Sequence, residues 1–145
     1  MTQPLHSRVL IDTGPLVAIL DRSDQYHHLC TETLRTIQPP LWTTWPVLTE
    51  AAWLLRNLPR GLQQLYGSVE SGLLQIAHLP ESSLAEVAKL QKRFQSLQPQ
   101  LADLTLLFVA EHETCPAIFT LDRRDFVVMQ KKSRSSLVLL PEAIE

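Results

Sequence analysis

Glycine and cysteine are both scarce in this chain of 145 residues. Only four glycines occur, and none lies in a GxGxxG or a GxxxxGKS/T pattern. Loops that hold nucleotide phosphates in Rossmann and P-loop proteins depend on those patterns, so both kinds of chemistry are disfavoured. The two cysteines, Cys30 and Cys115, lie far apart and form no CxxC pair or Cys/His cluster. We therefore expect two buried free thiols, not a disulfide framework or a structural zinc site.

The chain also lacks a long apolar run and a strong excess of charge. Its apolar stretches are far shorter than the roughly 18 residues that a membrane-spanning helix needs. Met1 to Arg8 lack the apolar core of a secretory signal, so we expect a cytoplasmic protein without a membrane partner. A net charge of −2 argues against coating nucleic acid by bulk charge, although it permits a local basic patch.

What the sequence does contain suits a single folded domain over residues 1–145. Hydrophobic residues make up 45% and charged residues 19% of the chain, as in ordinary folded domains. Short apolar runs predict strands at 9–11, 41–43, 73–79, 117–120 and 137–140. Helices are predicted at 15–20, 27–37, 44 to near 59, 60–71, 83–97 and 101–111. The alternation predicts an α/β fold, a three-layer α/β/α arrangement around a central, mainly parallel five-stranded sheet.

Local signals mark several of these helix starts. Pro46 suits a first turn, and Thr44 before it can cap the helix. Ser83 and Glu86 match the capping-box pattern. The segment 101–111 is apolar on nearly every face, which predicts a buried helix.

Four acidic residues stand where a ligand would bind in such a fold. Asp12 comes directly after the first predicted strand, and Asp122 comes just beyond the fourth. The carboxyl ends of parallel strands meet at one edge of the sheet, where open α/β folds bind their ligands. Glu50 and Asp103 lie in predicted helices among apolar neighbours. The four acids are therefore candidates for one site.

A divalent cation would explain why these acids are tolerated together. Acidic residues are rarely buried without a partner. No Lys or Arg lies within a helical turn of Asp103, and the nearest to Glu50 is Arg56. Converging carboxylates would repel each other strongly unless a cation offsets their charge. Oxygen ligands suit Mg²⁺ and Mn²⁺, and zinc is disfavoured because the set contains no Cys and no His.

Each acid also has a purely structural explanation. Asp12 suits the turn that it opens, and Glu50 suits an exposed helix face. Asp103 suits the first turn of a helix, where a negative charge complements the dipole, and Asp122 suits the cap of a turn. Taken singly these explanations are the simpler ones, whereas the four acids together favour a metal site.

Four segments resemble, in order, the four motifs of the PIN-domain family. They are VLIDTGPL at 9–16, LTEA at 48–51, LAD at 101–103 ahead of an apolar helix, and FTLDRRDF at 119–126. Order, spacing and length agree from 9 to 140, and the chain looks most like the single-domain VapC-type toxins of toxin–antitoxin pairs. The resemblance implies a Mg²⁺- or Mn²⁺-dependent endoribonuclease, with RNA as substrate and a cognate antitoxin as partner.

The resemblance also implies roles for individual residues. It places the catalytic and metal-binding roles on Asp12, Glu50, Asp103 and Asp122. Thr120 matches a position where a hydroxyl orders the site, and Thr13 is expected to act in the same way. Because Asp122 stands at the end of its strand, we expect it to bind the metal directly. Asp125, one helical turn later, is expected to support the site or to reach the metal through water.

RNA phosphates need basic partners, and several candidates follow the fourth motif. They are Arg123, Arg124, Lys131, Lys132 and Arg134, with Arg56 and Arg60 as weaker candidates. For the stretch from 131 to 134, a solvated surface loop is an equally good explanation. Apolar excess at Trp45, Trp53 and Leu54 favours packing in a homodimer, in agreement with the resemblance.

Three other functions agree less well with the sequence. A catalytically inactive PIN-like module that binds RNA or a protein is the main alternative, and the presence of all four acids disfavours it. Phosphatases with an Asp after the first strand need a second Asp two residues later, where this chain has Gly14. Receiver domains need an Asp on the third strand, and 73–79 contains none.

Overall fold

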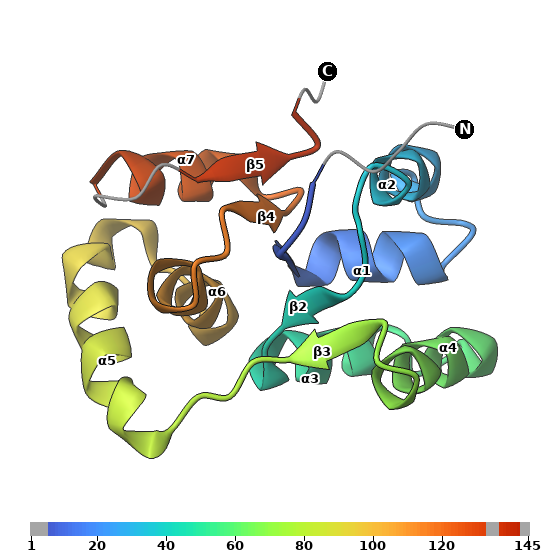
Figure 1. Cartoon of the computed structure of the whole chain (residues 1–145), viewed down its shortest axis with the longest axis horizontal. Helices are drawn as coiled ribbons and strands as arrows, with labels where there is room; N and C mark the ends of the chain where they lie inside the picture. The colour runs from blue at the N-terminus through green and yellow to red at the C-terminus, as the bar shows by residue number, and fades with distance from the viewer. Residues whose placement is uncertain (1–5, 133–136, 143–145) are drawn as a thin grey trace.

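The computed structural model describes residues 6–132 and 137–142. Within them, five strands of three residues each form one sheet, in the order β3-β2-β1-β4-β5, and every neighbouring pair is parallel (Figure 1). The strands are β1 (Val9–Ile11), β2 (Leu41–Thr43), β3 (Leu74–Ile76), β4 (Ala117–Phe119) and β5 (Val138–Leu140). The predicted five-stranded parallel sheet is confirmed.

The neighbouring strands β1 and β4 are buried on both faces, as a parallel sheet covered by helices requires. Every residue of β1 and of β4 is buried, and the two strands pair from Val9 with Ala117 to Ile11 with Phe119. Apolar side chains without polar atoms suit these positions. Since β1 is the middle strand, Asp12 follows it at the centre of the carboxyl edge of the sheet.

Helices cover both faces of the sheet. They are α1 (Thr13–Leu20), α2 (His27–Leu34), α3 (Trp45–Leu54), α4 (Pro59–Glu70), α5 (Leu84–Arg93), α6 (Leu101–His112) and α7 (Arg123–Lys132). Figure 1 shows α1, α2 and α4 on one side of the sheet and α5 and α6 on the other, which confirms the three-layer prediction. In the ranges that the structure describes, no helix is long and apolar enough to cross a bilayer.

Helix α7 is absent from the sequence-based prediction. Its charged ends, RRD and QKK, frame only the four apolar residues FVVM, which is too short a pattern to recognise. In the structure Phe126 and Met129 lie about one turn apart and are both buried. Asp125 in the first turn also suits the helix dipole.

The predicted helix at 83–97 is wrong in its detail. It divides into the 3₁₀ turn η1 (Glu81–Ser83), α5 and a second 3₁₀ turn, η2 (Gln95–Leu97). The Ser83 hydroxyl donates to the carbonyl of Pro80 at 2.6 Å, so the predicted capping box does not form. A local carbonyl competes here for the hydroxyl that would have capped the helix.

Other boundaries also differ from the prediction. Helix α1 begins at Thr13, two residues early, because Asp12 caps it. Helices α2 and α3 end at Leu34 and Leu54, earlier than predicted, and the strand predicted at 73–79 is reduced to β3. Both cysteines are buried and free, as predicted.

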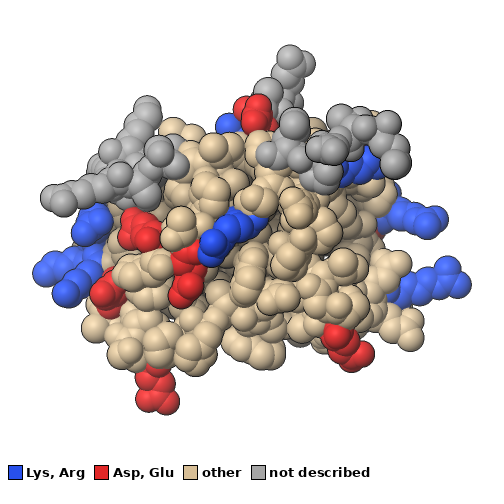
Figure 2. Space-filling view, in the orientation of Figure 1, with Lys and Arg blue, Asp and Glu red and all other residues tan. Residues whose placement is uncertain are grey.

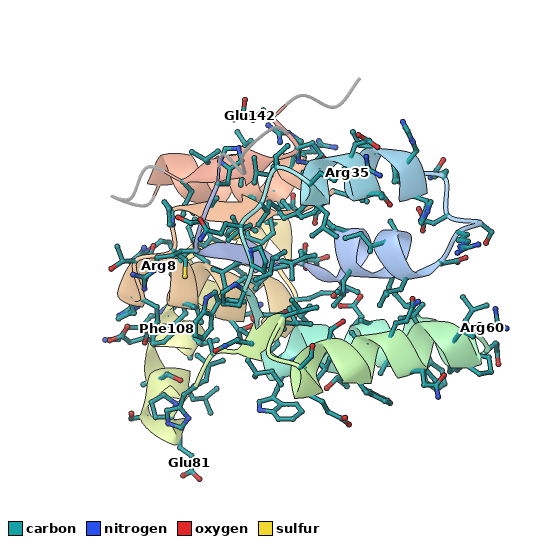
Figure 3. The ribbon with its side chains drawn as sticks, turned by 45° about the vertical axis from the view of Figure 1, so that its right-hand side comes forward. Arg8, Arg35, Arg60, Glu81, Phe108 and Glu142 are labelled. Atoms are coloured by element: carbon teal, nitrogen blue, oxygen red, sulfur yellow. The ribbon has the colours of Figure 1, made fainter. Side chains whose placement is uncertain are left out.

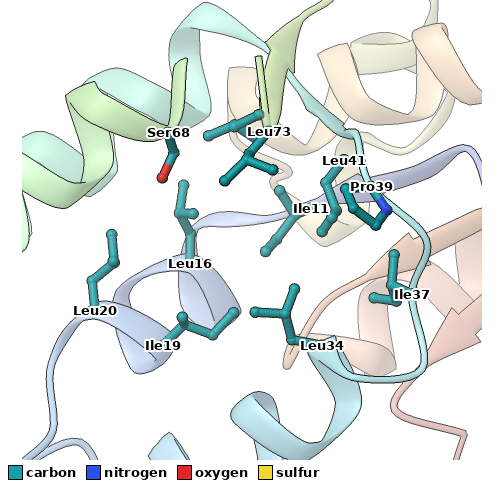
Figure 4. Close-up of a pocket in the computed structure, with 11 residues that line it drawn as sticks. Ile11, Leu16, Ile19, Leu20, Leu34, Ile37, Pro39, Leu41, Ser68 and Leu73 are labelled. Carbon is teal, nitrogen blue, oxygen red and sulfur yellow. The ribbon is translucent and has the colours of Figure 1, made fainter. Parts of the chain in front are cut away.

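An apolar cavity of about 300 Å³ lies between α1, α2 and α4, against one face of the sheet (Figure 4). Its lining consists of aliphatic side chains, such as Leu16 of α1 and Leu34 of α2, together with Pro39 and the single hydroxyl of Ser68. A lining without a titratable group offers nothing for acid–base or metal chemistry. This cavity is therefore not a candidate catalytic site.

Candidate active site

A pocket of about 370 Å³ opens at the carboxyl ends of β1 and β4. All four predicted acids line this acidic pocket, and Asp125 joins them. The full lining is Asp12, Thr13, Gly14, Glu50, Leu54, Gln98, Gln100, Asp103, Asp122 and Asp125. Segments far apart in the sequence thus bring five carboxylates to one place.

Asp12 is buried, and both of its carboxylate oxygens are held. Oδ1 accepts a hydrogen bond from the backbone N–H of Thr13 at 2.8 Å, which caps α1. Oδ2 accepts from the hydroxyl of Thr120 at 2.8 Å. The backbone N–H of Asp12 donates to the carbonyl of Phe119 at 2.9 Å, continuing the pairing of β1 with β4. Asp12 therefore caps α1 and lines the pocket with its carboxylate held in one orientation.

Thr120 links two of the acids through one hydroxyl. It donates to Asp12 and accepts from the backbone N–H of Asp122 at 3.0 Å. The Asp122 carboxylate in turn accepts from the N–H of Asp125 at the start of α7. The hydroxyl thus sets the position of Asp12 relative to the first turn of α7.

Glu50 and Asp103 reach the pocket from helices α3 and α6. Glu50 is half-buried and accepts a hydrogen bond from the Thr13 hydroxyl at 3.2 Å. Asp103 is half-buried and accepts from the backbone N–H of Gln100 at 3.2 Å, within a capping box at the start of α6. Asp103 is therefore a helix-terminal acid, as its structural explanation says. The same residue also lines the pocket.

A buried pair of hydroxyls holds α6 against α3. The Oγ atoms of Thr44 and Thr105 lie 2.8 Å apart. Since the Thr105 hydroxyl donates to the carbonyl of Ala102 at 2.8 Å, the hydroxyl of Thr44 is the donor to Thr105. This use of Thr44 replaces the predicted capping of α3 and fixes the distance between the two helices that carry Glu50 and Asp103.

Burial, assisted by the nearby negative charges, raises the pKa of three of the acids. Burial, followed by repulsion from Asp12, Asp122 and Glu50, raises the pKa of Asp103 to about 7. Burial also raises the pKa of Asp12, and its hydrogen bonds oppose the shift. For Asp122, burial and the charge of Asp125 raise the pKa. The pocket therefore favours protons or a cation over free carboxylates.

Comparison with known proteins identifies the fold family. Residues 9–132 match the family model described as PIN domain. The chain belongs to the PIN domain family. The crystal structure of Mycobacterium tuberculosis VapC20, described as a sarcin–ricin loop cleaving toxin, is similar with a TM-score of 0.74. The match has 16% sequence identity and covers 83% of this chain and 94% of that chain, so it shows a shared fold. No curated protein matches the sequence.

The PIN domain has a donor set that suits Mg²⁺ or Mn²⁺. Carboxylate and hydroxyl oxygens are the ligands that hard divalent cations prefer. Among residues 6–132 and 137–142, no group of three or more Asp, Glu, His or Cys side chains is already drawn together tightly enough to hold an ion. A cation would therefore have to draw the carboxylates inward, and their raised pKa values show that added positive charge is favoured there.

The described lining of the acidic pocket contains no Lys or Arg. The Arg123 guanidinium donates to the carbonyls of Leu139, Pro141 and Glu142, so it holds the C-terminal segment. Arg124 is exposed at the start of α7. Lys131 and Lys132 lie at the end of α7, and Arg134 falls outside the described residues.

Arg56 and Arg60 are the two weaker candidates for contact with RNA. The Arg56 guanidinium stacks over the Trp53 ring, 4.0 Å from its centroid, and donates to the Trp53 carbonyl. Arg60 lies at the outer end of α4 (Figure 3). On the face shown in Figure 2, Lys and Arg side chains lie mostly at the two lateral margins, and one lies near the middle beside acidic side chains. RNA binding by these residues stays a prediction.

Sequence reasoning missed two residues of the pocket, Gln98 and Gln100. Gln100 precedes the predicted helix at 101–111 and stands three residues before Asp103, which is the spacing of a capping box. That signal was present in the sequence. Gln98 carries no such signal, because its place depends on the path of the chain between η2 and α6.

Removing the charge of Asp103 should stabilise the metal-free protein at high pH. Its folded pKa of about 7 lies above the ordinary 3.8, so the folded state binds the proton more tightly. The stability of the parent should therefore fall as pH rises from about 4 to about 7, and stay low above that. Asp103→Asn should be more stable than the parent at pH 8 by roughly 2 kcal/mol, about half of the full linkage value because the side chain is partly exposed.

Thermal unfolding with and without Mn²⁺ would check this expectation. Metal should raise the Tm of the parent at pH 8 by mass action, and the Asp103→Asn variant should lose that rise. Asp21→Asn, which changes an exposed acid outside the pocket, should keep it. A parent Tm that millimolar Mn²⁺ or Mg²⁺ leaves unchanged would contradict a cation site.

Proposed function

We propose that this PIN domain is an endoribonuclease that uses Mg²⁺ or Mn²⁺ to hydrolyse phosphodiester bonds in RNA. The acidic pocket carries the proposal, because five carboxylates line it, and burial together with repulsion from Asp12, Asp122 and Glu50 raises the pKa of Asp103 to about 7. An RNA phosphate cannot approach such a pocket unless a cation offsets its charge. Family membership and the fold likeness to VapC20, described as a sarcin–ricin loop cleaving toxin, support the same function.

Each residue of the pocket would have a distinct task. Asp12, Glu50, Asp103 and Asp122 would hold the ion. When bound, a divalent cation activates water and offsets charge on the phosphate. Thr120 keeps the Asp12 carboxylate oriented, and Thr13 does the same for Glu50. Water is the nucleophile, since the one hydroxyl on the described lining is that of Thr13, which already bonds Glu50.

Cleavage assays would test the proposal. Purified protein should cut RNA in Mg²⁺ or Mn²⁺, and EDTA should stop the reaction. An Asp12→Asn protein purified in the same way controls for contaminating ribonuclease. RNA that is bound but stays uncut in every divalent metal would favour the inactive binding module instead.

We further propose that the protein is the toxin of a toxin–antitoxin pair and acts on RNA in the cytoplasm. The antitoxin would cover the acidic pocket and place an Arg or Lys against its carboxylates, where a basic group takes the position of the cation. The description of VapC20 as a toxin supports the proposal. Co-expression with a small neighbouring reading frame should suppress cleavage. Changing every basic residue in that partner's C-terminal segment to alanine should restore it.

A homodimer is expected to form through a tryptophan patch on α3 and α6. This patch consists of Trp45, Trp53, Leu54 and Leu101, which are 62%, 64%, 50% and 51% exposed. Three of them line a groove of about 660 Å³ next to the acidic pocket. Exposed apolar side chains grouped in this way are typical of protein interfaces.

Light scattering should give twice the 16.5 kDa mass of the chain at tens of micromolar. Trp53→Glu should shift the protein to the monomer, since it places a charge in the buried centre of the interface. Leu84→Glu is the matched control, because Leu84 on α5 is also 64% exposed and lies outside the patch. A parent protein that is monomeric at this concentration would contradict the expectation.

A further inference from the structure

Gln98 lies on the rim of the acidic pocket with an unusual backbone conformation. Its φ of 49° and ψ of 52° fall in the left-handed region, which is unfavourable for a residue with a Cβ. Pro99 follows and restricts the backbone of the residue before it further. Glycine would adopt this conformation freely. The chain therefore retains a glutamine side chain at a position where the backbone favours glycine.

The loop around Gln98 is held in place on both sides. The N–H of Gln98 donates to the carbonyl of Gln95 at 3.1 Å and closes η2. The Gln91 side chain donates to the carbonyl of Pro99 at 3.3 Å. Gln100 then takes part in the capping box of α6. These contacts involve the backbone of the loop, so none of them requires a glutamine side chain at position 98.

The carboxamide of Gln98 is free for a ligand. It makes no hydrogen bond to any residue that the structure describes, although Gln98 lines the pocket. Among the described lining side chains, N–H donors belong to Gln98 and Gln100 alone, and none carries a positive charge. In the capping box the side-chain oxygen of Gln100 accepts from the N–H of Asp103, so the N–H groups of both carboxamides can donate to a ligand. Gln98 is the one of the two whose whole carboxamide is free for a substrate.

A neutral donor has an advantage beside five carboxylates. A lysine or arginine at position 98 would pair with the acids and compete with a cation for them. A carboxamide N–H can hydrogen-bond a phosphate oxygen and leaves the charge of the acids unchanged. The chemistry of the position therefore suits an anionic ligand that arrives at a metal-loaded pocket.

We propose that Gln98 binds the RNA substrate, with its carboxamide N–H donating to a non-bridging oxygen of the phosphate next to the one that is cut. The proposal deepens the proposed ribonuclease function and rests on it. Gln98 contributes to substrate binding and not to the chemical step.

Three variants test the assignment by steady-state cleavage of RNA and by thermal unfolding. Gln98→Gly removes the carboxamide and relieves the backbone, so KM should rise about ten-fold, as for loss of a hydrogen bond to a charged group, with kcat within two-fold. Its Tm should equal or exceed that of the parent. Gln98→Glu keeps the shape but replaces the N–H donors by a charge, so KM should rise further. Gln95→Ala, in the same loop and outside the pocket, should match the parent.

The outcomes separate this proposal from the proposed function. A parent that cleaves RNA, with a Gln98→Gly variant of unchanged KM, overturns the role of Gln98 alone. The same holds if Gln95→Ala raises KM equally, or if Gln98→Gly loses the Mn²⁺-induced rise in Tm, because the loop and not the carboxamide would then be responsible. A parent that cuts no RNA in any divalent metal overturns both.

Discussion

Replacing Asp12 by asparagine should lower metal-dependent RNA cleavage by at least about 1,000-fold, equivalent to about 4 kcal/mol of transition-state stabilisation. Asp12 lies at the centre of the carboxyl edge, and both of its oxygens are held in place by Thr13 and Thr120. Asparagine preserves the shape and still accepts from the Thr13 N–H. The charge that would bind the cation is lost, whereas the fold should remain stable because burial already disfavours that charge.

Single-turnover rates of cleavage would measure the effect, with circular dichroism to confirm the fold. Thr120→Val keeps the carboxylate and removes the hydroxyl that orients it, so the loss should be smaller, about 10- to 100-fold. Asp21→Asn is the control outside the pocket and should leave the rate unchanged. A folded Asp12→Asn protein that keeps more than a tenth of the parent rate would refute the role of Asp12.

Asp122→Asn should impair cleavage more than Asp125→Asn, by at least about 100-fold against about 10-fold. Both acids line the pocket, but they act on different neighbours. The charge of Asp122 contributes to the raised pKa of both Asp12 and Asp103. The charge of Asp125 is felt by Asp122. Asp122 is therefore the acid expected to share a cation with Asp12.

Both variants should fold, which makes the comparison clean. Asparagine caps helices as well as aspartate does, so Asp122→Asn can still accept from the N–H of Asp125. Asp125→Asn leaves that donor in place. Single-turnover rates at saturating Mn²⁺, and the Mn²⁺ concentration needed for half the maximal rate, should both rank the variants in the stated order. The reverse order would assign the fourth acid to Asp125.

The framework of the fold could be read from the sequence because its signals are local. The run Val9–Ile11 followed by an acid marks a buried strand that ends at a ligand-binding edge, and the structure places Asp12 there. Glu50 and Asp103 stood out because they interrupt apolar helix faces without a basic neighbour. The alternation of strands and helices predicted a parallel sheet, and the observed order places β1 beside β4, which brings Asp12 and Asp122 to one edge.

What could not be predicted depends on partners that the sequence patterns do not identify, some of them distant and some local. The hydroxyls of Thr44 and Ser83 match capping patterns, yet each finds a different partner once the chain has folded. Arg123 follows a motif acid and suggested an RNA contact, but its guanidinium meets carbonyls of the C-terminal segment. Gln98 owes its place to a left-handed turn before a proline, for which glutamine is not a typical residue.

The guanidinium of Arg123 also bears on where this protein can be shortened. The family match ends at residue 132, which invites a truncated protein that stops there. Such a truncation would remove β5, expose the edge of β4 to pairing with other chains, and deprive Arg123 of the carbonyls of Leu139, Pro141 and Glu142. Because Arg123 is the neighbour of Asp122, the damage would reach the acidic pocket. A minimal expressed domain should therefore retain residues 137–142, and a purification tag is better placed at the N-terminus.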